Sequence, residues 1–157
     1  MQIVNTSHVE DIKPKVNLVG LTRPELEEIL TGAGLAKFRA GQIWHWIYHK
    51  GKIDFSEMTT LSKTIRAELC QNYELSRPHI SQEQKSDDGT IKWLLRFADG
   101  AEAETVYIPE KDRGTLCISS QIGCTLTCSF CHTGTQRLVR NLTPQELVGQ
   151  VLTAMDF

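Results

Sequence analysis

The stretch Gln121-Ile-Gly-Cys-Thr-Leu-Thr-Cys-Ser-Phe-Cys-His-Thr-Gly134 lies between an apolar segment, Thr115–Ser119, and the helix-start pattern Asn141-Leu-Thr-Pro-Gln-Glu146. In that pattern Thr143 is a candidate N-cap, and Glu146 three residues later completes a capping box. The expected apolar face of this helix consists of Leu147, Val151, Leu152 and Met155. A strand, a loop and a helix in this order predict the first βα unit of an α/β fold. Barrels of this class place their active sites at the carboxyl ends of the strands, where this loop begins.

The loop contains three cysteines, Cys124, Cys128 and Cys131, in the spacing Cys-x-x-x-Cys-x-x-Cys. A structural zinc ion takes four protein ligands, and an ordinary iron–sulfur cluster takes four cysteines. Three thiolates on a four-iron cluster leave one iron open for a second ligand. The amino and carboxylate groups of S-adenosylmethionine can bind there, and the cluster can then pass an electron to the sulfonium.

Two other metal centres compete with this interpretation. His132 could complete a Cys₃His zinc site, although adjacent ligands rarely both reach one tetrahedral ion. The segment Cys128-Ser-Phe-Cys131-His132 also matches the attachment pattern of c-type haem. Haem attachment of that type requires export, and the N-terminal residues show no signal-peptide pattern.

Upstream of the loop, the pattern predicts three short helices followed by a three-stranded antiparallel meander. The helices are expected from Thr22, an N-cap whose capping box Glu25 completes, to about Gly32, and then over 37–50 and over 61–72. The strands are expected over 80–85, 91–97 and 103–108, where the pattern changes to an alternation of period two. Asp-Gly pairs at 88–89 and 99–100 are strong hairpin signals. Residues 1–20 are polar and predict a flexible leader.

The second expected helix combines basic and aromatic residues and has no acidic residue. Such a mixture suits RNA, through phosphate pairing and base stacking. Ile43, Trp44, Ile47 and Tyr48 are expected to form the core stripe of this helix. The outward-facing candidates for RNA contact are Lys37, Arg39, Trp46, Lys50 and Lys52, joined by Arg137 and Arg140 after the cysteine loop.

The bulk composition is that of a globular chain. The 157 residues are 40% hydrophobic with a formal net charge of −2, which argues against a uniformly basic nucleic-acid coat but permits a local basic face. No apolar run approaches the roughly 18–20 residues of a membrane span. We therefore expect a cytoplasmic protein without membrane contact, in which clustered cysteines bind metal and the separate Cys70 packs in a core.

The residues around the loop resemble those of the RlmN/Cfr family of radical-SAM RNA methyltransferases. The similarity is carried by Glu104-Thr-Val-Tyr-Ile-Pro109, Arg113-Gly-Thr-Leu-Cys-Ile-Ser-Ser-Gln-Ile-Gly-Cys124, Cys128-Ser-Phe-Cys131, Thr133-Gly-Thr-Gln136 and Arg140-Asn-Leu-Thr143. It implies a partial TIM barrel with a 4Fe-4S cluster and S-adenosylmethionine, and an RlmN-type enzyme that methylates carbon 2 of an adenine in 23S rRNA and in certain tRNAs. A flavodoxin or ferredoxin would supply electrons.

The resemblance also implies roles for individual residues. Cys124, Cys128 and Cys131 would hold the cluster, Glu104 would accept a proton, and Cys117 would be the resolving thiol. In the family scheme, another cysteine near the C-terminus carries the methyl group, and Cys117 releases the RNA adduct through a transient disulfide. Judged from the residues alone, Cys117 is as readily a buried strand residue, and Glu104 a solvated strand charge.

This chain ends before the methyl-carrying cysteine and most of the barrel, so we expect the N-terminal portion of a longer enzyme, inactive alone. The expected divisions are a leader over 1–20, a helical RNA-binding accessory domain over 21–75, a β meander over 76–110 and an incomplete radical-SAM core over 111–157. The fold class is thus α+β leading into the first βα unit of an incomplete α/β barrel. A Cfr-type enzyme acting on carbon 8, and a non-catalytic zinc-holding RNA-binding fragment, remain alternatives.

Overall fold

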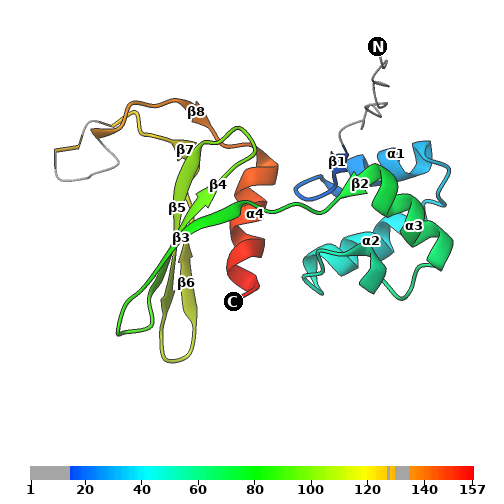
Figure 1. Cartoon of the computed structure of the whole chain (residues 1–157), viewed down its shortest axis with the longest axis horizontal. Helices are drawn as coiled ribbons and strands as arrows, with labels where there is room; N and C mark the ends of the chain where they lie inside the picture. The colour runs from blue at the N-terminus through cyan, green and yellow to red at the C-terminus, as the bar shows by residue number, and fades with distance from the viewer. Residues whose placement is uncertain (1–14, 127, 130–134) are drawn as a thin grey trace, which may run out of the picture.

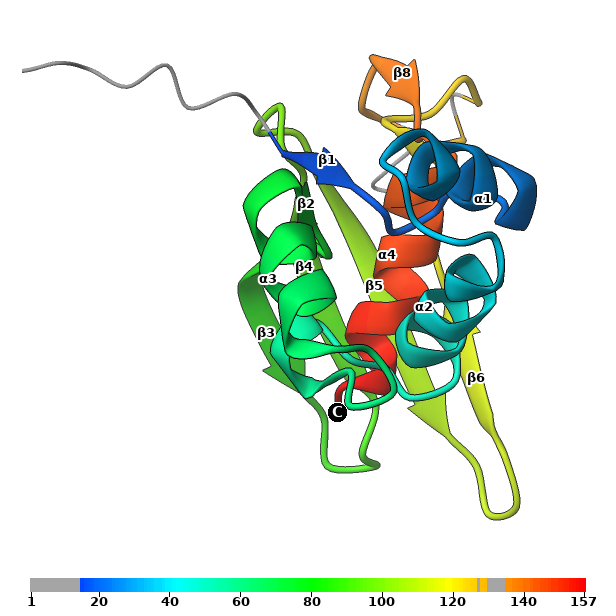
Figure 2. The ribbon, with the colours of Figure 1, turned by 90° about the vertical axis from the view of Figure 1, so that its right-hand side faces the viewer.

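The computed structural model describes residues 15–126, 128–129 and 135–157. Three helices form one lobe, an antiparallel sheet forms a second, and the last helix, α4 (Pro144–Met155), lies between the two (Figures 1 and 2). None of the helices in the described ranges is long and apolar enough to cross a membrane.

The helical lobe follows the predicted pattern closely. Its helices are α1 (Arg23–Gly32), α2 (Phe38–Tyr48) and α3 (Lys63–Asn72), with the short 3₁₀ helix η1 (Phe55–Glu57) between the last two. Both predicted capping boxes are present: the Thr22 N–H donates to Glu25 Oε2 (2.6 Å), and the Thr143 N–H donates to Glu146 Oε2 (2.7 Å). These contacts satisfy backbone N–H groups that have no partner at the start of a helix. The capping-box pattern therefore predicts where both helices begin.

The expectation of a leader over residues 1–20 is wrong for its last part, whereas residues 1–14 lie outside the described residues. Strand β1 (Val16–Asn17) pairs in parallel with β2 (Tyr73–Glu74), which directly follows α3. Leu18 and Val19 are fully buried in the core of the helical lobe. The strand pairing and the two buried apolar residues together anchor this segment. Such a short run shows no hydrophobic periodicity, so the sequence pattern did not predict its burial.

The sheet has four strands in the order β3-β4-β5-β6, one more than the predicted meander. Its strands are β3 (His79–Lys85), β4 (Ile91–Arg96), β5 (Glu102–Pro109) and β6 (Gly114–Cys117). The two Asp-Gly turns are confirmed, with Gly89 at φ +85 and Gly100 at φ +84. Both glycines adopt the left-handed conformation that favours this residue in tight turns.

Strand β6 corrects the prediction of a separate parallel unit. This segment was expected to begin a βα barrel, but it pairs antiparallel with β5, placing Val106 opposite Cys117. The charged residues 110–113 form the hairpin between them, where the Glu110 N–H donates to the Arg113 carbonyl (2.7 Å). The described residues form a mixed α+β structure without a closed barrel.

Helix α4 is buried on two sides rather than one. Leu147 packs with Phe97, Ala103 and Leu142 of the sheet lobe, whereas Val148 and Leu152 join the core of the helical lobe. The predicted apolar face included Met155, which is instead 62% exposed. A helix held between two layers follows no single apolar stripe, so the one-sided pattern misplaced this residue.

Gln150 attaches α4 to the sheet through its side-chain amide. Its Oε1 accepts from Thr105 Oγ1 (2.9 Å) and from the Ser119 N–H (2.9 Å). Its Nε2 donates to the Ser119 carbonyl (2.9 Å) and to the Glu146 carbonyl (3.3 Å). Gln150 and Thr105 are completely buried, so this group of polar atoms is satisfied without help from solvent.

The amide of Gln150 generates the first prediction. Gln150→Leu keeps the side-chain volume but leaves buried polar groups of Thr105 and Ser119 without partners. Because each such group costs about 1–3 kcal/mol, we expect the free energy of unfolding to fall by about 2–4 kcal/mol. Chemical denaturation followed by circular dichroism measures the change. The matched control is Gln71→Leu at an exposed position of α3, with an expected change within about 0.5 kcal/mol; equal losses in both variants would contradict the assignment.

Candidate functional site

Glu104 and Cys117 lie on the same face of the sheet. Val106 is directly opposite Cys117 in the β5–β6 register, and Glu104 is two residues from Val106 along β5. Residues two apart on a strand share a face, and diagonal neighbours in an antiparallel pair lie about 7–8 Å apart. Thr105, which lies between Glu104 and Val106 on β5, faces α4 instead. The structure therefore brings the two predicted reactive residues together on the face away from α4.

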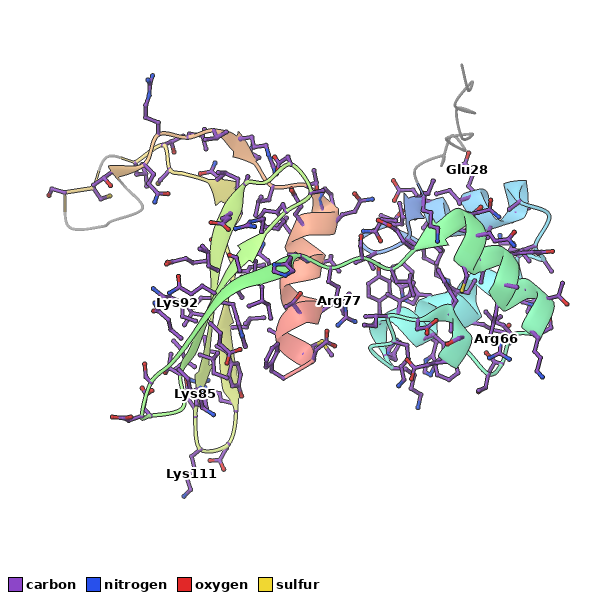
Figure 3. The ribbon with its side chains drawn as sticks, viewed as in Figure 1. Glu28, Arg66, Arg77, Lys85, Lys92 and Lys111 are labelled. Carbon is purple, nitrogen blue, oxygen red and sulfur yellow. The ribbon has the colours of Figure 1, made fainter. Side chains whose placement is uncertain are left out.

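Glu104 is exposed on this face and held by one ion pair. Lys92 Nζ lies 3.1 Å from Glu104 Oε1 and comes from the neighbouring strand β4. Figure 3 shows Lys92 on the side of the sheet opposite α4. The Ser119 hydroxyl donates to the Glu104 carbonyl (2.8 Å) and so ties the end of β6 to the same strand position. Lys92 was not expected at the site, because only the strand register reveals that it neighbours Glu104.

Cys117 is exposed at the end of β6 and has a free thiol. The alternative of a buried strand cysteine is thus wrong for this position. Cys70, by contrast, is half-buried and packs against the core of the helical lobe, as expected. No disulfide joins any of the four cysteines in the described part of the chain, which are Cys70, Cys117, Cys124 and Cys128.

The cysteine loop is closed at its base by a two-stranded ribbon. Strand β7 (Gln121–Ile122) pairs antiparallel with β8 (Arg140–Asn141). Gly123 follows with φ +76, and a Cβ there would lie 2.1 Å from the Arg137 carbonyl oxygen, so only glycine fits this crossing. The described parts of the loop extend from the sheet on the side away from α4 (Figure 1).

Two of the three predicted cluster ligands are in the described residues. Cys124 and Cys128 are both half-buried with free thiols, and Cys131, like His132, lies outside the described residues. The Leu126 N–H donates to Cys124 Sγ (3.3 Å). Backbone N–H groups directed at sulfur stabilise thiolate ligands and tune iron–sulfur clusters, so this donor set fits the predicted cluster. Within the described residues, no three metal-ligating side chains converge.

Arg140 is committed to a network that holds the ribbon to α4. Its Nη2 lies 2.6 Å from Asp99 Oδ2 and 2.8 Å from Glu146 Oε1. The Ala101 N–H and the Arg140 guanidinium lower the pKa of Asp99 below its ordinary value. Burial opposes ionisation of Glu146, but hydrogen bonds from Arg140 and Thr143 still lower its pKa. These two carboxylates already neutralise Arg140, whereas Arg137 is exposed near the loop.

The basic candidates on and beside α2 lie at the surface, several of them already in contacts. Lys37 pairs with Glu27 (3.2 Å), and Lys52 pairs with Glu57 (2.6 Å). Arg39 donates to Gln42 Oε1 (2.8 Å), while Lys50 is exposed. Exposed ion pairs contribute little energy and exchange readily for phosphate.

Trp46 differs from its expected outward orientation. It is half-buried, packs against the core of the helical lobe and donates its Nε1–H to Thr60 Oγ1 (2.8 Å). The exposed rings of α2 are Phe38, His45 and His49, which sequence analysis missed. Phe38 is 62% exposed with the Arg39 guanidinium 4.7 Å from its ring centroid, and the two histidines stack at 5.1 Å. Their spacing of seven and four residues places all three on one helical face, which is the signal that could have found them.

Three comparisons bear on this arrangement. The family profile described as "Ribosomal RNA large subunit methyltransferase N-terminal domain" matches residues 16–75. A protein from Rhodospirillum rubrum named dual-specificity RNA methyltransferase RlmN is 63% identical over 141 residues, covering 90% of this chain and 33% of that protein. A relative of the same name from Rhodopseudomonas palustris is 57% identical over 160 residues, covering 96% of this chain and 39% of that protein.

A solved structure agrees with the sequence relatives. The crystal structure of a radical SAM methyltransferase from Sphaerobacter thermophilus matches with a TM-score of 0.80 and 46% identity, covering 88% of this chain and 41% of that one. The chain spans a little over a third of the length of the curated relatives it matches. Over most of its length the chain is therefore similar to part of the dual-specificity RNA methyltransferases named RlmN, and its residues 16–75 match the N-terminal domain of that family.

Proposed function

We propose that this chain is the N-terminal part of a radical-SAM methyltransferase that methylates carbon 2 of an adenine in 23S rRNA and in certain tRNAs. The observation that carries the proposal is the shared sheet face: Glu104 and Cys117 are both exposed on the side from which the cysteine loop extends. The matched relatives are named for dual-specificity RNA methylation, which favours carbon 2 over the Cfr-type carbon 8 alternative.

Cys124, Cys128 and Cys131 are the proposed ligands of a 4Fe-4S cluster. Such a cluster would supply the electron for reductive cleavage of the sulfonium of S-adenosylmethionine. The β7–β8 ribbon holds the base of the loop, and the Leu126 N–H supports the charge of the Cys124 sulfur. An electron donor such as flavodoxin or ferredoxin is the proposed redox partner.

Glu104 and Cys117 have distinct proposed roles. Lys92 lies beside Glu104 and orients its carboxylate to accept the proton that the adenine ring must lose. Cys117, as a thiolate, attacks the sulfur of the methyl-carrying cysteine while that sulfur is still bonded to the carbon attached to the adenine. The S–S bond forms as this S–C bond breaks, and the carbon keeps the electron pair and takes up a proton, which releases the RNA. That second cysteine belongs to the remainder of the protein, so the chain alone is proposed to be inactive.

The helical lobe is the proposed RNA-binding accessory domain over 21–75, followed by the meander over 76–110 and the core over 111–157. Lys37, Arg39, Lys50 and Lys52 would neutralise phosphates, and Arg137 would do so beside the loop. Phe38 and the stacked histidines offer exposed rings for unpaired bases. A cytoplasmic location is part of the same proposal.

The cluster assignment predicts that anaerobic reconstitution of the chain with iron and sulfide yields a brown protein with about four irons per chain. Adding S-adenosylmethionine to the reduced sample should change its EPR spectrum. Cys124→Ser and Cys128→Ser should each lose most of the bound iron, whereas Cys70→Ser, away from the loop, should keep it. A colourless chain with stoichiometric zinc would support the non-catalytic alternative.

The RNA assignment predicts that Phe38→Ala weakens binding of an RNA stem-loop by about 5- to 150-fold, because stacking of one base on an aromatic ring is worth about 1–3 kcal/mol. Fluorescence anisotropy with a labelled stem-loop measures the dissociation constant. The matched control is Ile53→Ala, since Ile53 is similarly exposed in the same lobe but has no ring. Equal affinity of the wild type and Phe38→Ala would remove the face of α2 from the proposed RNA site.

A further inference from the structure

Helix α4 contacts the helical lobe through two close backbone approaches. Pro78, in the segment that leaves the lobe, lies against Gly149, where a Cβ would be 2.7 Å from the proline Cδ. On the other side, Gly20 lies against Gln145, and a Cβ at Gly20 would be 2.3 Å from the Gln145 Cα. Gly20 is itself fixed to the lobe, because its N–H donates to Tyr48 Oη (2.8 Å). The lobe and α4 therefore meet at a spacing that only glycine permits.

Arg77 is buried at this seam and bonds to both sides of it. Its Nη2 donates to the carbonyl of Gly51, which follows α2 in the helical lobe (3.0 Å). Its Nη1 donates to the Leu152 carbonyl of α4 (3.0 Å) and pairs with Asp156. Figure 3 shows Arg77 between α4 and the helical lobe, and its side chain is only 8% exposed.

The acceptor on α4 is one that the helix cannot satisfy alone. Leu152 lies in the last turn, where backbone carbonyls have no partner within the helix. A cation at that end also interacts favourably with the helix dipole. Only a planar guanidinium presents donors in two directions at fixed spacing, so lysine could not bridge the Gly51 and Leu152 carbonyls in the same way. Arg77 Nε has no partner among the described residues, which makes the bridge costly to bury.

The opposite side of α4 is attached to the sheet that carries the reactive residues. Gln150 binds Ser119, two residues after Cys117, and Ser119 also binds the Glu104 carbonyl. Gln150 follows Gly149 and is two residues from Leu152, so both attachments lie on neighbouring turns of one helix. A displacement at the Arg77 seam is therefore transmitted through α4 to the orientation of the sheet.

We propose that Arg77 is a positioning residue: it fixes the helical lobe against α4 and thereby sets the separation between the exposed face of α2 and the sheet face with Glu104 and Cys117. The consequence for RNA rests on the proposed function, since the lobe would hold the substrate while the sheet face acts on it. The geometric part concerns this chain alone and is tested without activity.

The test measures the distance between the two lobes. Nitroxide labels on non-natural ketone residues at positions 28 and 111, which avoid the five cysteines, report the separation of the lobe and the sheet tip by double electron–electron resonance. Glu28 and Lys111 are exposed at opposite ends of the molecule (Figure 3). We expect one narrow distance distribution for the wild type and a broad distribution with additional distances for Arg77→Ala.

The matched control is Arg66→Ala. Arg66 also has a buried Nε without a partner, but it bonds to Ser56 within the helical lobe. Arg66→Ala should lower the midpoint of thermal unfolding and leave the distance distribution narrow. A loss of stability alone would then not produce the broad distribution expected for Arg77→Ala. If Arg77→Ala does not fold, Gly149→Ala tests the same seam, because its Cβ pushes against Pro78 and should shift the mean distance.

Unchanged distributions in folded Arg77→Ala or in Gly149→Ala would overturn the proposal. RNA affinity, measured in the same variants, separates this proposal from the proposed function. If the wild-type chain binds no RNA while Arg77→Ala still shows the broadened distances, the RNA role is contradicted and the positioning role stays intact.

Discussion

Gln150 has every hydrogen-bonding position of its amide filled inside the protein, by Thr105, Ser119 and the Glu146 carbonyl. The rest of the structure depends on this interaction, because it joins α4 to β5 and to Ser119, two residues after Cys117. The other side of the same helix packs into the core of the helical lobe through Val148 and Leu152. One helix thus connects the lobe proposed to bind RNA with the sheet proposed to carry the reactive groups.

The strand register explains how the chemistry is separated from this support. Thr105 and Ala103 turn towards α4 and are buried, while the intervening Glu104 is exposed on the opposite face. Cys117 joins that face through its pairing with Val106, and the cysteine loop leaves the sheet on the same side. The exposed polar residues of this face therefore take no space within the core.

Much of this arrangement follows from local sequence. The capping boxes at Thr22 and Thr143, the Asp-Gly turns and the alternation in β5 each report a structure formed by neighbouring residues, and each prediction was confirmed. The errors concern long-range contacts: the pairing of Val16–Asn17 with β2, the pairing of β6 with β5, and the burial of α4 on two sides.

The site shows the same division between local and long-range information. The resemblance identified Glu104 and Cys117, but only the register shows that they share a face and that Lys92 neighbours Glu104. On α2, the basic and aromatic composition led to the wrong aromatic ring being expected at the surface. Trp46 found a partner in Thr60, which is distant in sequence, whereas Phe38 remained exposed.

The most direct test of the account is hydrogen exchange of the backbone amides, because protection reports which elements open together. If α4 is the shared support, its amides between Val148 and Leu152 should be protected as strongly as those of β5 and α1, and all should exchange in one cooperative opening. Rapid exchange throughout α4, with the sheet and the helical lobe still protected, would contradict the claim that this helix holds the two parts together.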